Sequence, residues 1–147
     1  MTQEDKELLL RDLCARLPYG VKVKIKYYDD VWELLAIYTN GTTYATRDIG
    51  YPIETYFEDC KPYLFPLSSM TEEMLEELNA NGFFKYRDTI ANVSHLENKN
   101  GINEEIYTYI DIECNSFLIE YFHSYHIDYK GFIEKGLAID ATDKNIY

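Results

Sequence analysis

The chain has 147 residues, a net charge of −12 and 46% hydrophobic residues, which fits one folded domain or two small lobes that share a core. No segment approaches the roughly 18 consecutive apolar residues of a membrane helix. The first residues lack the basic and apolar regions of a secretory signal. We therefore expect a soluble, cytoplasmic protein. The negative charge, most of it in the C-terminal half, disfavours nucleic acid as a partner.

Three cysteines, Cys14, Cys60 and Cys114, are far apart in the sequence and form no C-x-x-C pair. An odd number of widely spaced cysteines argues against a disulfide framework and against a zinc knuckle. We expect reduced, mostly buried thiols, and we predict no cofactor.

The opening segment predicts a helix over residues 3–17. Thr2 is followed three residues later by Asp5, which is a variant of the capping box, and Pro18 with Gly20 marks the end of the helix. Apolar residues recur at helical spacing and form one predicted core stripe: Leu9, Leu10, Leu13, Cys14 and Leu17.

Residues 20–58 predict a four-strand antiparallel meander. The segment VKVKIKYY alternates apolar residues with lysines, as a strand with one buried face does. Asn40-Gly41 predicts a two-residue type I′ hairpin turn, and Pro52 suits an edge strand or a strand start. The meander is compatible with an SH3-like barrel. Three lysines share one strand face and form either a solvated outer face or a guarded sheet edge: Lys22, Lys24 and Lys26.

The second half begins with an extended connector around Pro62 and Pro66. Ser69 and Glu72 then form a predicted capping box for a helix that ends near Asn81-Gly82. The face of this helix opposite its apolar residues is a predicted solvated acidic face. It carries Glu72, Glu73, Glu76 and Glu77.

Residues 83–104 fit either a strand or an irregular helix, with a loop at its end. EEIYTYIDIEC alternates apolar and polar residues as far as Cys114 and predicts a strand. A helix over residues 116–126 follows, capped by Asn115 or Ser116. Its predicted core face consists of Leu118, Tyr121, Phe122 and Tyr125.

These elements place the chain in the α+β class: an N-terminal helix, a four-strand meander, a helix, a strand and C-terminal helices. We predict one domain over residues 1–147, with a helix and meander lobe at 1–66 and an acidic helix and strand lobe at 67–147.

The segment YFHSYHIDYKGF contains the strongest candidate for a metal site, formed by His123, His126 and Asp128. Metalloprotease helices, however, carry H-E-x-x-H with histidines four residues apart, whereas these are three apart. The simpler interpretation is that Asp128 caps a turn that starts at Tyr129, with Gly136 as its stop. No Walker A loop or serine-nucleophile motif occurs, and we assign no catalytic residue.

Fifteen tyrosines are the main compositional feature. Tyrosine is enriched at protein interfaces because its ring is rigid and amphipathic, although rings can equally fill a core that is short of leucine. Together with the four glutamates of the acidic helix, five tyrosines are the interface candidates: Tyr44, Tyr51, Tyr56, Tyr107 and Tyr109.

Three segments together are similar to a known family: LPYGVK at 17–22, KPYLFPLSSMTEE at 61–73 and HIDYKGFIEKGLAIDA at 126–141. They resemble a family of small proteins encoded by gut Bacteroidales, their phages and their mobile elements. The chain departs from the family pattern at Phe65, where arginine is common, and at His123, where asparagine is common. The resemblance implies an origin and no particular activity, and the second departure weakens the metal hypothesis.

The sequence thus favours a non-enzymatic, acidic protein that binds another protein, in a phage or mobile-element setting a host protein. Two alternatives stay open. One is a metal-binding protein or metal-dependent hydrolase that uses His123, His126 and Asp128. The other is a small barrel that binds nucleic acid through its lysine face.

Overall fold

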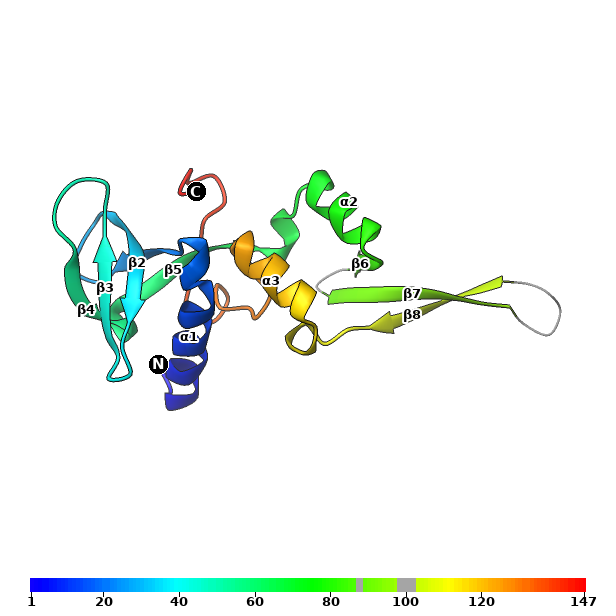
Figure 1. Cartoon of the computed structure of the whole chain (residues 1–147), viewed down its shortest axis with the longest axis horizontal. Coiled ribbons are helices and arrows are strands. Elements are labelled where there is room, and N and C mark those ends of the chain that lie inside the picture. The colour runs from blue at the N-terminus through cyan, green and yellow to red at the C-terminus, as the bar shows by residue number, and fades with distance from the viewer. Residues whose placement is uncertain (87–88, 98–102) are drawn as a thin grey trace. The chain divides into compact units, whose positions relative to one another are not determined.

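The computed structural model describes residues 1–86, 89–97 and 103–147 (Figure 1). The chain is mixed α+β and divides into two compact units, one of Met1–Pro66 with Phe122–Tyr147 and one of Leu67–Tyr121. The sequence places the first boundary at the same residue. It assigns the C-terminal segment to the wrong lobe, because that segment pairs with a strand of the first unit.

Helix α1, Gln3–Arg16, begins at the predicted capping box. Thr2 accepts a hydrogen bond from the Asp5 backbone N–H, and the Asp5 carboxylate accepts one from the Thr2 N–H. The helix continues into the 3-10 turn η1, Leu17–Tyr19. Its buried face differs in part from the predicted stripe, because Asp12 and Arg16 are buried there and Cys14 is exposed.

The predicted meander forms the sheet of the first unit, with each strand antiparallel to the next (Figure 1). Strand β4 is its edge strand, as the position of Pro52 just before it suggested. The four strands are β1, Lys22–Ile25; β2, Val31–Ile37; β3, Thr42–Thr46; and β4, Ile53–Tyr56.

The turn between β2 and β3 lies where Asn40-Gly41 predicts it but is of a different type. The Gly41 N–H donates to the Tyr38 carbonyl at 2.9 Å, and the Tyr38 N–H donates to the Thr42 carbonyl at 2.8 Å. Gly41 has φ of 86° and Asn40 is not among the residues with positive φ, whereas a type I′ turn requires positive φ at both. The connection is therefore a three-residue loop with a left-handed glycine.

The predicted connector after the meander is strand β5, Cys60–Pro66, with the 3-10 turn η2, Phe57–Asp59, before it. Strand β5 pairs antiparallel with β1, and the short strands β9, Ile127–Asp128, and β10, Ile139–Asp140, pair parallel with β5. In the described part of the chain β4 and β5 do not pair, so the sheet is open. The SH3-like barrel with which the meander sequence is compatible is not shown.

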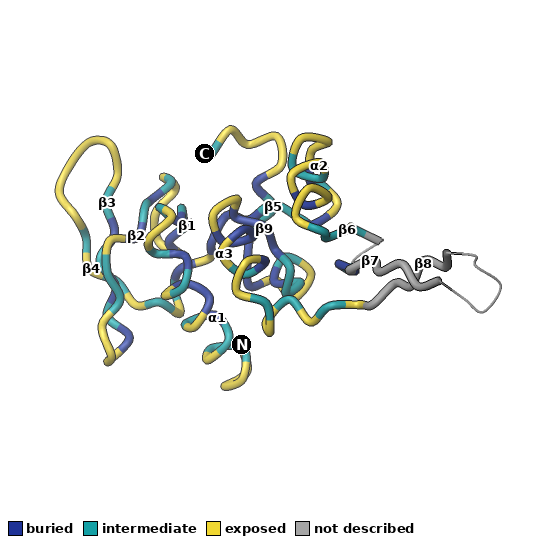
Figure 2. The backbone as a smooth tube through the Cα atoms, turned by 45° about the vertical axis from the view of Figure 1, so that its right-hand side comes forward, coloured by how far each residue is buried: buried dark blue, intermediate teal, exposed yellow. Residues whose placement is uncertain are grey.

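The core of the first unit lies between α1 and the inner face of this sheet. Alternation along β1 buries Val21, Val23 and Ile25, while the lysines between them point outward. Figure 2 shows the contrast between these buried strands and the loop at 47–52, which is exposed throughout. The other buried residues of this cluster are Leu9, Leu13, Trp32, Leu34, Ala45 and Cys60.

The second unit contains the 3-10 turn η3, Leu67–Ser69, and helix α2, Glu72–Ala80. The N-cap of α2 is Thr71, which accepts a hydrogen bond from the Met74 N–H at 3.2 Å, so the predicted Ser69 box is wrong by two residues. The helix buries Leu78 and stops before Gly82, as expected.

Three strands complete the second unit in an antiparallel sheet: β6, Phe83–Tyr86; β7, Thr89–Glu97; and β8, Asn103–Tyr109. Most of the predicted loop at its turn lies outside the described residues. Strand β8 ends earlier than predicted, because Ile112–Cys114 forms the 3-10 turn η4, in which the Asp111 carboxylate accepts a hydrogen bond from the Glu113 N–H.

Helix α3, Ser116–Ser124, begins after Asn115, whose side chain accepts a hydrogen bond from the Leu118 N–H at 3.0 Å. This confirms the predicted cap. Leu118 and Phe122 are buried as predicted, whereas Tyr125 lies past the helix end and is 42% exposed. No helix in the described ranges has both the length and the apolar character needed to cross a membrane.

Candidate functional site

The two histidines of the predicted metal site are buried, but their side chains have different neighbours. His123 lies on α3, and its Nε2 is 3.1 Å from the Tyr129 hydroxyl. His126 follows the helix with φ of 57°, a left-handed conformation that turns the chain away from the helix. Its ring stacks on the Tyr147 ring at 3.8 Å between centroids.

Asp128 has the capping role that the sequence predicts. Its two carboxylate oxygens accept hydrogen bonds from the backbone N–H groups of Phe132 at 2.9 Å and Ile133 at 2.8 Å. Gly136, at the end of the turn, has φ of 72°. The carboxylate is thus directed at the backbone of the following turn.

A buried ion pair between Asp12 and Arg16 lies beside His123. The Arg16 Nε donates to Asp12 at 2.8 Å, and its Nη2 donates to the Ile127 carbonyl at 2.8 Å. The other Asp12 oxygen is 4.0 Å from His123 Nε2. This pair was not predicted from the sequence, although an acid and a base four residues apart on a helix are a recognisable signal.

Burial lowers the pKa of His123 to about 4 and that of His126 to about 4, with the Arg16 charge as a second cause for both. Both imidazoles are therefore neutral at pH 7. Within the described residues, no group of three or more His, Cys, Asp or Glu side chains is arranged to hold a metal ion. The cluster instead joins α1, α3 and the C-terminal segment.

Of the three cysteines, only Cys60 is buried, and burial raises the pKa of its thiol to about 12. Cys14 and Cys114 are exposed, so the expectation of mostly buried thiols is wrong. None of the three is in a disulfide.

The outer sheet face of the first unit is the surface of β1–β4 opposite the core. The strand pairing identifies the residues of this face, because side chains of directly paired residues point to the same side of a sheet. Tyr44 pairs with Glu54 and Thr42 with Tyr56, while Thr43 and Ala45 between them are buried. The outer sheet face comprises Lys22, Lys24, Val31, Glu33, Ala36, Tyr38, Thr42, Tyr44, Thr46, Glu54 and Tyr56.

One hollow on this face, the tyrosine cleft, has a volume of about 400 Å³ and is lined by Tyr38, Thr39, Asn40, Thr42, Tyr44 and Glu54. The rings of Tyr38 and Tyr44 pack edge to face with centroids 5.6 Å apart. The Tyr44 hydroxyl donates to Glu54 at 2.8 Å, and this bond, together with the Glu54 charge, raises the pKa of Tyr44. Two aromatic rings and a carboxylate thus meet at one exposed place.

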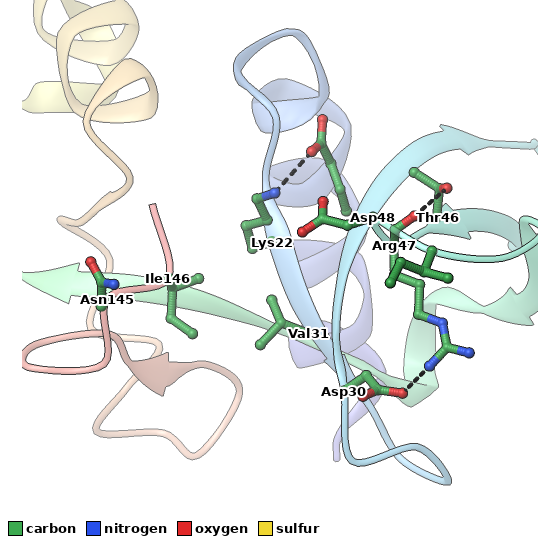
Figure 3. A pocket seen from close by; sticks show the side chains of 10 residues that line it. Lys22, Asp30, Val31, Thr46, Arg47, Asp48, Asn145 and Ile146 are labelled. Carbon is green, nitrogen blue, oxygen red and sulfur yellow. Dashed lines mark hydrogen bonds and ion pairs between the residues drawn. The ribbon is translucent and has the colours of Figure 1, made fainter.

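A second hollow, the charged pocket, has a volume of about 620 Å³ (Figure 3). Lys22 forms an ion pair with Glu33 at 3.0 Å, and Arg47 forms one with Asp30. The cations of this pocket therefore have acidic partners within the pocket itself. Its lining consists of Lys22, Asp30, Val31, Glu33, Thr46, Arg47, Asp48, Ile49, Asn145 and Ile146.

The predicted lysine stripe is likewise compensated. Lys24 forms an ion pair with Asp29 at 3.1 Å, and the Lys26 ammonium lies 5.2 Å from the centroid of the Tyr27 ring. Phosphate binding requires basic groups that can release counterions. Lys22 and Lys24 therefore have acidic partners, and Lys26 has an aromatic one.

The remaining interface candidates are exposed wherever their side chains are described. Tyr51 is 91% exposed and Tyr56 60% in the first unit, and Tyr109 is 62% exposed in the second. The Tyr107 side chain lies outside the described part. On α2 the predicted acidic face is exposed as expected, through Glu72, Glu73, Glu76 and Glu77.

Comparison of the chain with protein-family models, with curated proteins and with solved structures finds no match. The geometry of the outer sheet face is therefore the basis for a proposed function.

Proposed function

We propose that the protein is a non-enzymatic binding module that holds another protein through the outer sheet face of its first unit. The observation that supports this most directly is the gathering of three tyrosines across β2, β3 and β4 on the outer sheet face. Tyr38 is 55% exposed and Tyr56 is 60% exposed, and Tyr44 lies between their strands.

The size of this surface suits a protein partner. An aromatic side chain can bury about 150–250 Å² in all, and Tyr38 and Tyr56 are each a little more than half exposed, so these two rings supply about a quarter of the roughly 800 Å² that each partner contributes to a standard interface. Tyrosine also loses little conformational entropy on binding, because it has only two side-chain torsions.

The backbone of β4 offers a second mode of contact. Strand β4 pairs only with β3 in the described part of the chain, so its other edge presents N–H and C=O groups. An extended segment of a partner can add to such an edge as a further strand. The rings of the outer sheet face would then recognise the side chains of that segment.

The resemblance to proteins of gut Bacteroidales and their phages makes a host protein in the bacterial cytoplasm the first partner to seek. The acidic face of α2 is a further contact candidate, since all four of its glutamates are exposed. The buried histidines hydrogen-bond and stack inside the first unit, and this supports a module without catalysis.

The test is affinity capture of the tagged full chain from a gut Bacteroidales lysate treated with nuclease, followed by a salt wash and mass spectrometry. We expect one near-stoichiometric protein with the wild type. The double variant Tyr38→Ala, Tyr56→Ala should lose it. Tyr109→Ala, an equally exposed tyrosine of the second unit, should retain it.

Circular dichroism of each variant checks that the fold is intact. Equal capture by the double variant, or beads without a bound protein, would contradict the proposal.

A further inference from the structure

The charged and aromatic groups that line the tyrosine cleft all favour a positively charged ligand. The only charged residue among its six lining residues is Glu54. The faces of Tyr38 and Tyr44 carry negative potential, as aromatic rings do. The cleft therefore attracts a positive group.

Glu54 also differs from three other acids of the first unit. Asp29, Asp30 and Glu33 each hold a lysine or arginine, whereas Glu54 forms no ion pair with a basic side chain within the described ranges. Its bond from Tyr44 uses one acceptor position of the carboxylate, and a carboxylate has about four. Acceptor positions remain for an incoming donor.

We propose that the tyrosine cleft binds an arginine side chain of the partner protein, with the guanidinium plane against Tyr38 and its N–H groups on Glu54. This inference rests on the proposed function and specifies the chemistry of the partner. Arginine fits better than lysine, because its planar guanidinium both stacks on aromatic faces and donates to a carboxylate through two parallel bonds. An apolar side chain would cover the Glu54 carboxylate without a partner, which is unfavourable.

The sheet geometry gives the arginine a route to the cleft. A strand added to the edge of β4 places the residue opposite Glu54 about 5 Å away on the same face. From there the arginine side chain extends over Glu54 toward the Tyr44 ring on β3, against which the Tyr38 ring packs with centroids 5.6 Å apart.

The test is an NMR titration of the full chain, labelled at its tyrosine rings, with the peptide acetyl-Gly-Gly-Arg-Gly-Gly-amide. The control peptide contains citrulline, which keeps the shape of arginine and lacks its charge. We expect saturable shifts of the Tyr38 and Tyr44 rings with a Kd of about 10 mM, and no saturation with citrulline. A lysine peptide should bind more weakly.

The variants Glu54→Gln and Tyr38→Ala should each weaken binding of the arginine peptide about fivefold or more. Asp48→Asn removes an acid that lines the charged pocket and lies outside the cleft, and it should change the affinity less than about twofold. Equal weakening by Asp48→Asn and Glu54→Gln would overturn the inference, because the peptide would then be responding to the general negative field. Equal binding of the lysine peptide would overturn the assignment to arginine.

The two proposals can fail separately. Binding of the arginine peptide in the cleft, with no protein captured from lysate, would uphold the cation site and contradict the binding module. A captured partner that depends on Tyr38 and Tyr56 but persists in Glu54→Gln would uphold the module and overturn the arginine site.

Discussion

Arg16 is the largest fully buried side chain of the first unit, and its charge is only partly compensated. It donates to Asp12 and to the Ile127 carbonyl, but its Nη1 and the Asp12 Oδ1 have no hydrogen-bond partner in the described part of the chain. Moving two charges out of water is costly, so such a pair contributes little net stability. What it provides is a specific connection between α1 and β9.

The first prediction follows from this imbalance. Arg16→Met leaves the Asp12 carboxylate buried without its cation and should lower the free energy of unfolding by about 3–5 kcal/mol, as measured by urea denaturation. The double variant Asp12→Leu, Arg16→Met should cost much less than Arg16→Met alone. If the loss of unfolding free energy in the double variant equals the sum of the losses in Asp12→Leu and Arg16→Met measured singly, this explanation is contradicted.

Tyr147 connects three parts of the first unit through one side chain. Its hydroxyl donates to the Tyr63 carbonyl at 2.9 Å and accepts from the Lys22 N–H at 2.9 Å, and its ring stacks on His126. Burial raises the pKa of this hydroxyl. The phenol therefore remains protonated and available as a donor throughout the neutral range.

The second prediction concerns that hydroxyl. Tyr147→Phe keeps the ring stacking and removes two hydrogen bonds, and because Tyr147 is 43% exposed water can partly replace them, so the variant should destabilise the protein by about 1 kcal/mol. The matched control is Tyr51→Phe, since Tyr51 is 91% exposed. Thermal unfolding of both variants checks the difference, and a Tyr147→Phe transition equal to that of the control would refute the connection.

At the scale of elements, the β2–β3 hairpin depends on one glycine. Gly41 adopts φ of 86°, and a Cβ placed there would lie 3.2 Å from the Phe57 ring. The Gly41 carbonyl also accepts a hydrogen bond from the Phe57 N–H at 3.1 Å. The loop is thus fixed both by backbone conformation and by the neighbouring turn η2.

The third prediction compares two left-handed glycines. Gly131 has φ of 72° and open space around its would-be Cβ, so Gly131→Ala should cost only the backbone strain of about 1 kcal/mol. Gly41→Ala should cost more, because the Phe57 ring must also shift. Chemical denaturation of the two variants measures the difference, and equal losses would mean that Phe57 is not a constraint.

At the scale of the whole molecule, two buried neutral histidines make stability depend on pH. The pKa values of His123 and His126 fall from the ordinary 6.5 to about 4 in the folded chain. Below pH 6.5 the unfolded chain therefore binds protons that the folded chain does not. The two histidines therefore do not lower the free energy of unfolding above pH 6.5, and they lower it progressively as the pH drops from 6.5 toward 4.

The fourth prediction is the size of this loss, up to about 3 kcal/mol per histidine between pH 6.5 and 4. The variants His123→Asn and His126→Asn should each flatten the slope, and asparagine also tolerates the left-handed backbone at His126. Denaturation midpoints at several pH values provide the measurement. An unchanged slope in both variants would show that other groups cause the pH dependence.

The sequence determined the elements that depend on local signals. The Thr2–Asp5 capping box, the Asn115 cap, the glycine turn at 40–41 and the alternation along β1 all appear where predicted, because each needs only neighbouring residues. The outward direction of the α2 glutamates also follows from helical periodicity alone.

The tertiary structure decided what depends on distant contacts. From the sequence, strand β5 was predicted as an extended connector, because its partners β1, β9 and β10 lie far away in the sequence. The burial of Arg16 depends on Asp12 and on the Ile127 carbonyl, and the packing of the His126 ring depends on Tyr147. The tyrosine cleft likewise required the β2–β3–β4 register to bring Tyr38, Tyr44 and Glu54 together. Interactions between neighbouring residues determine the helices and turns, whereas strand pairing and the burial of charged side chains depend on contacts between segments far apart in the sequence.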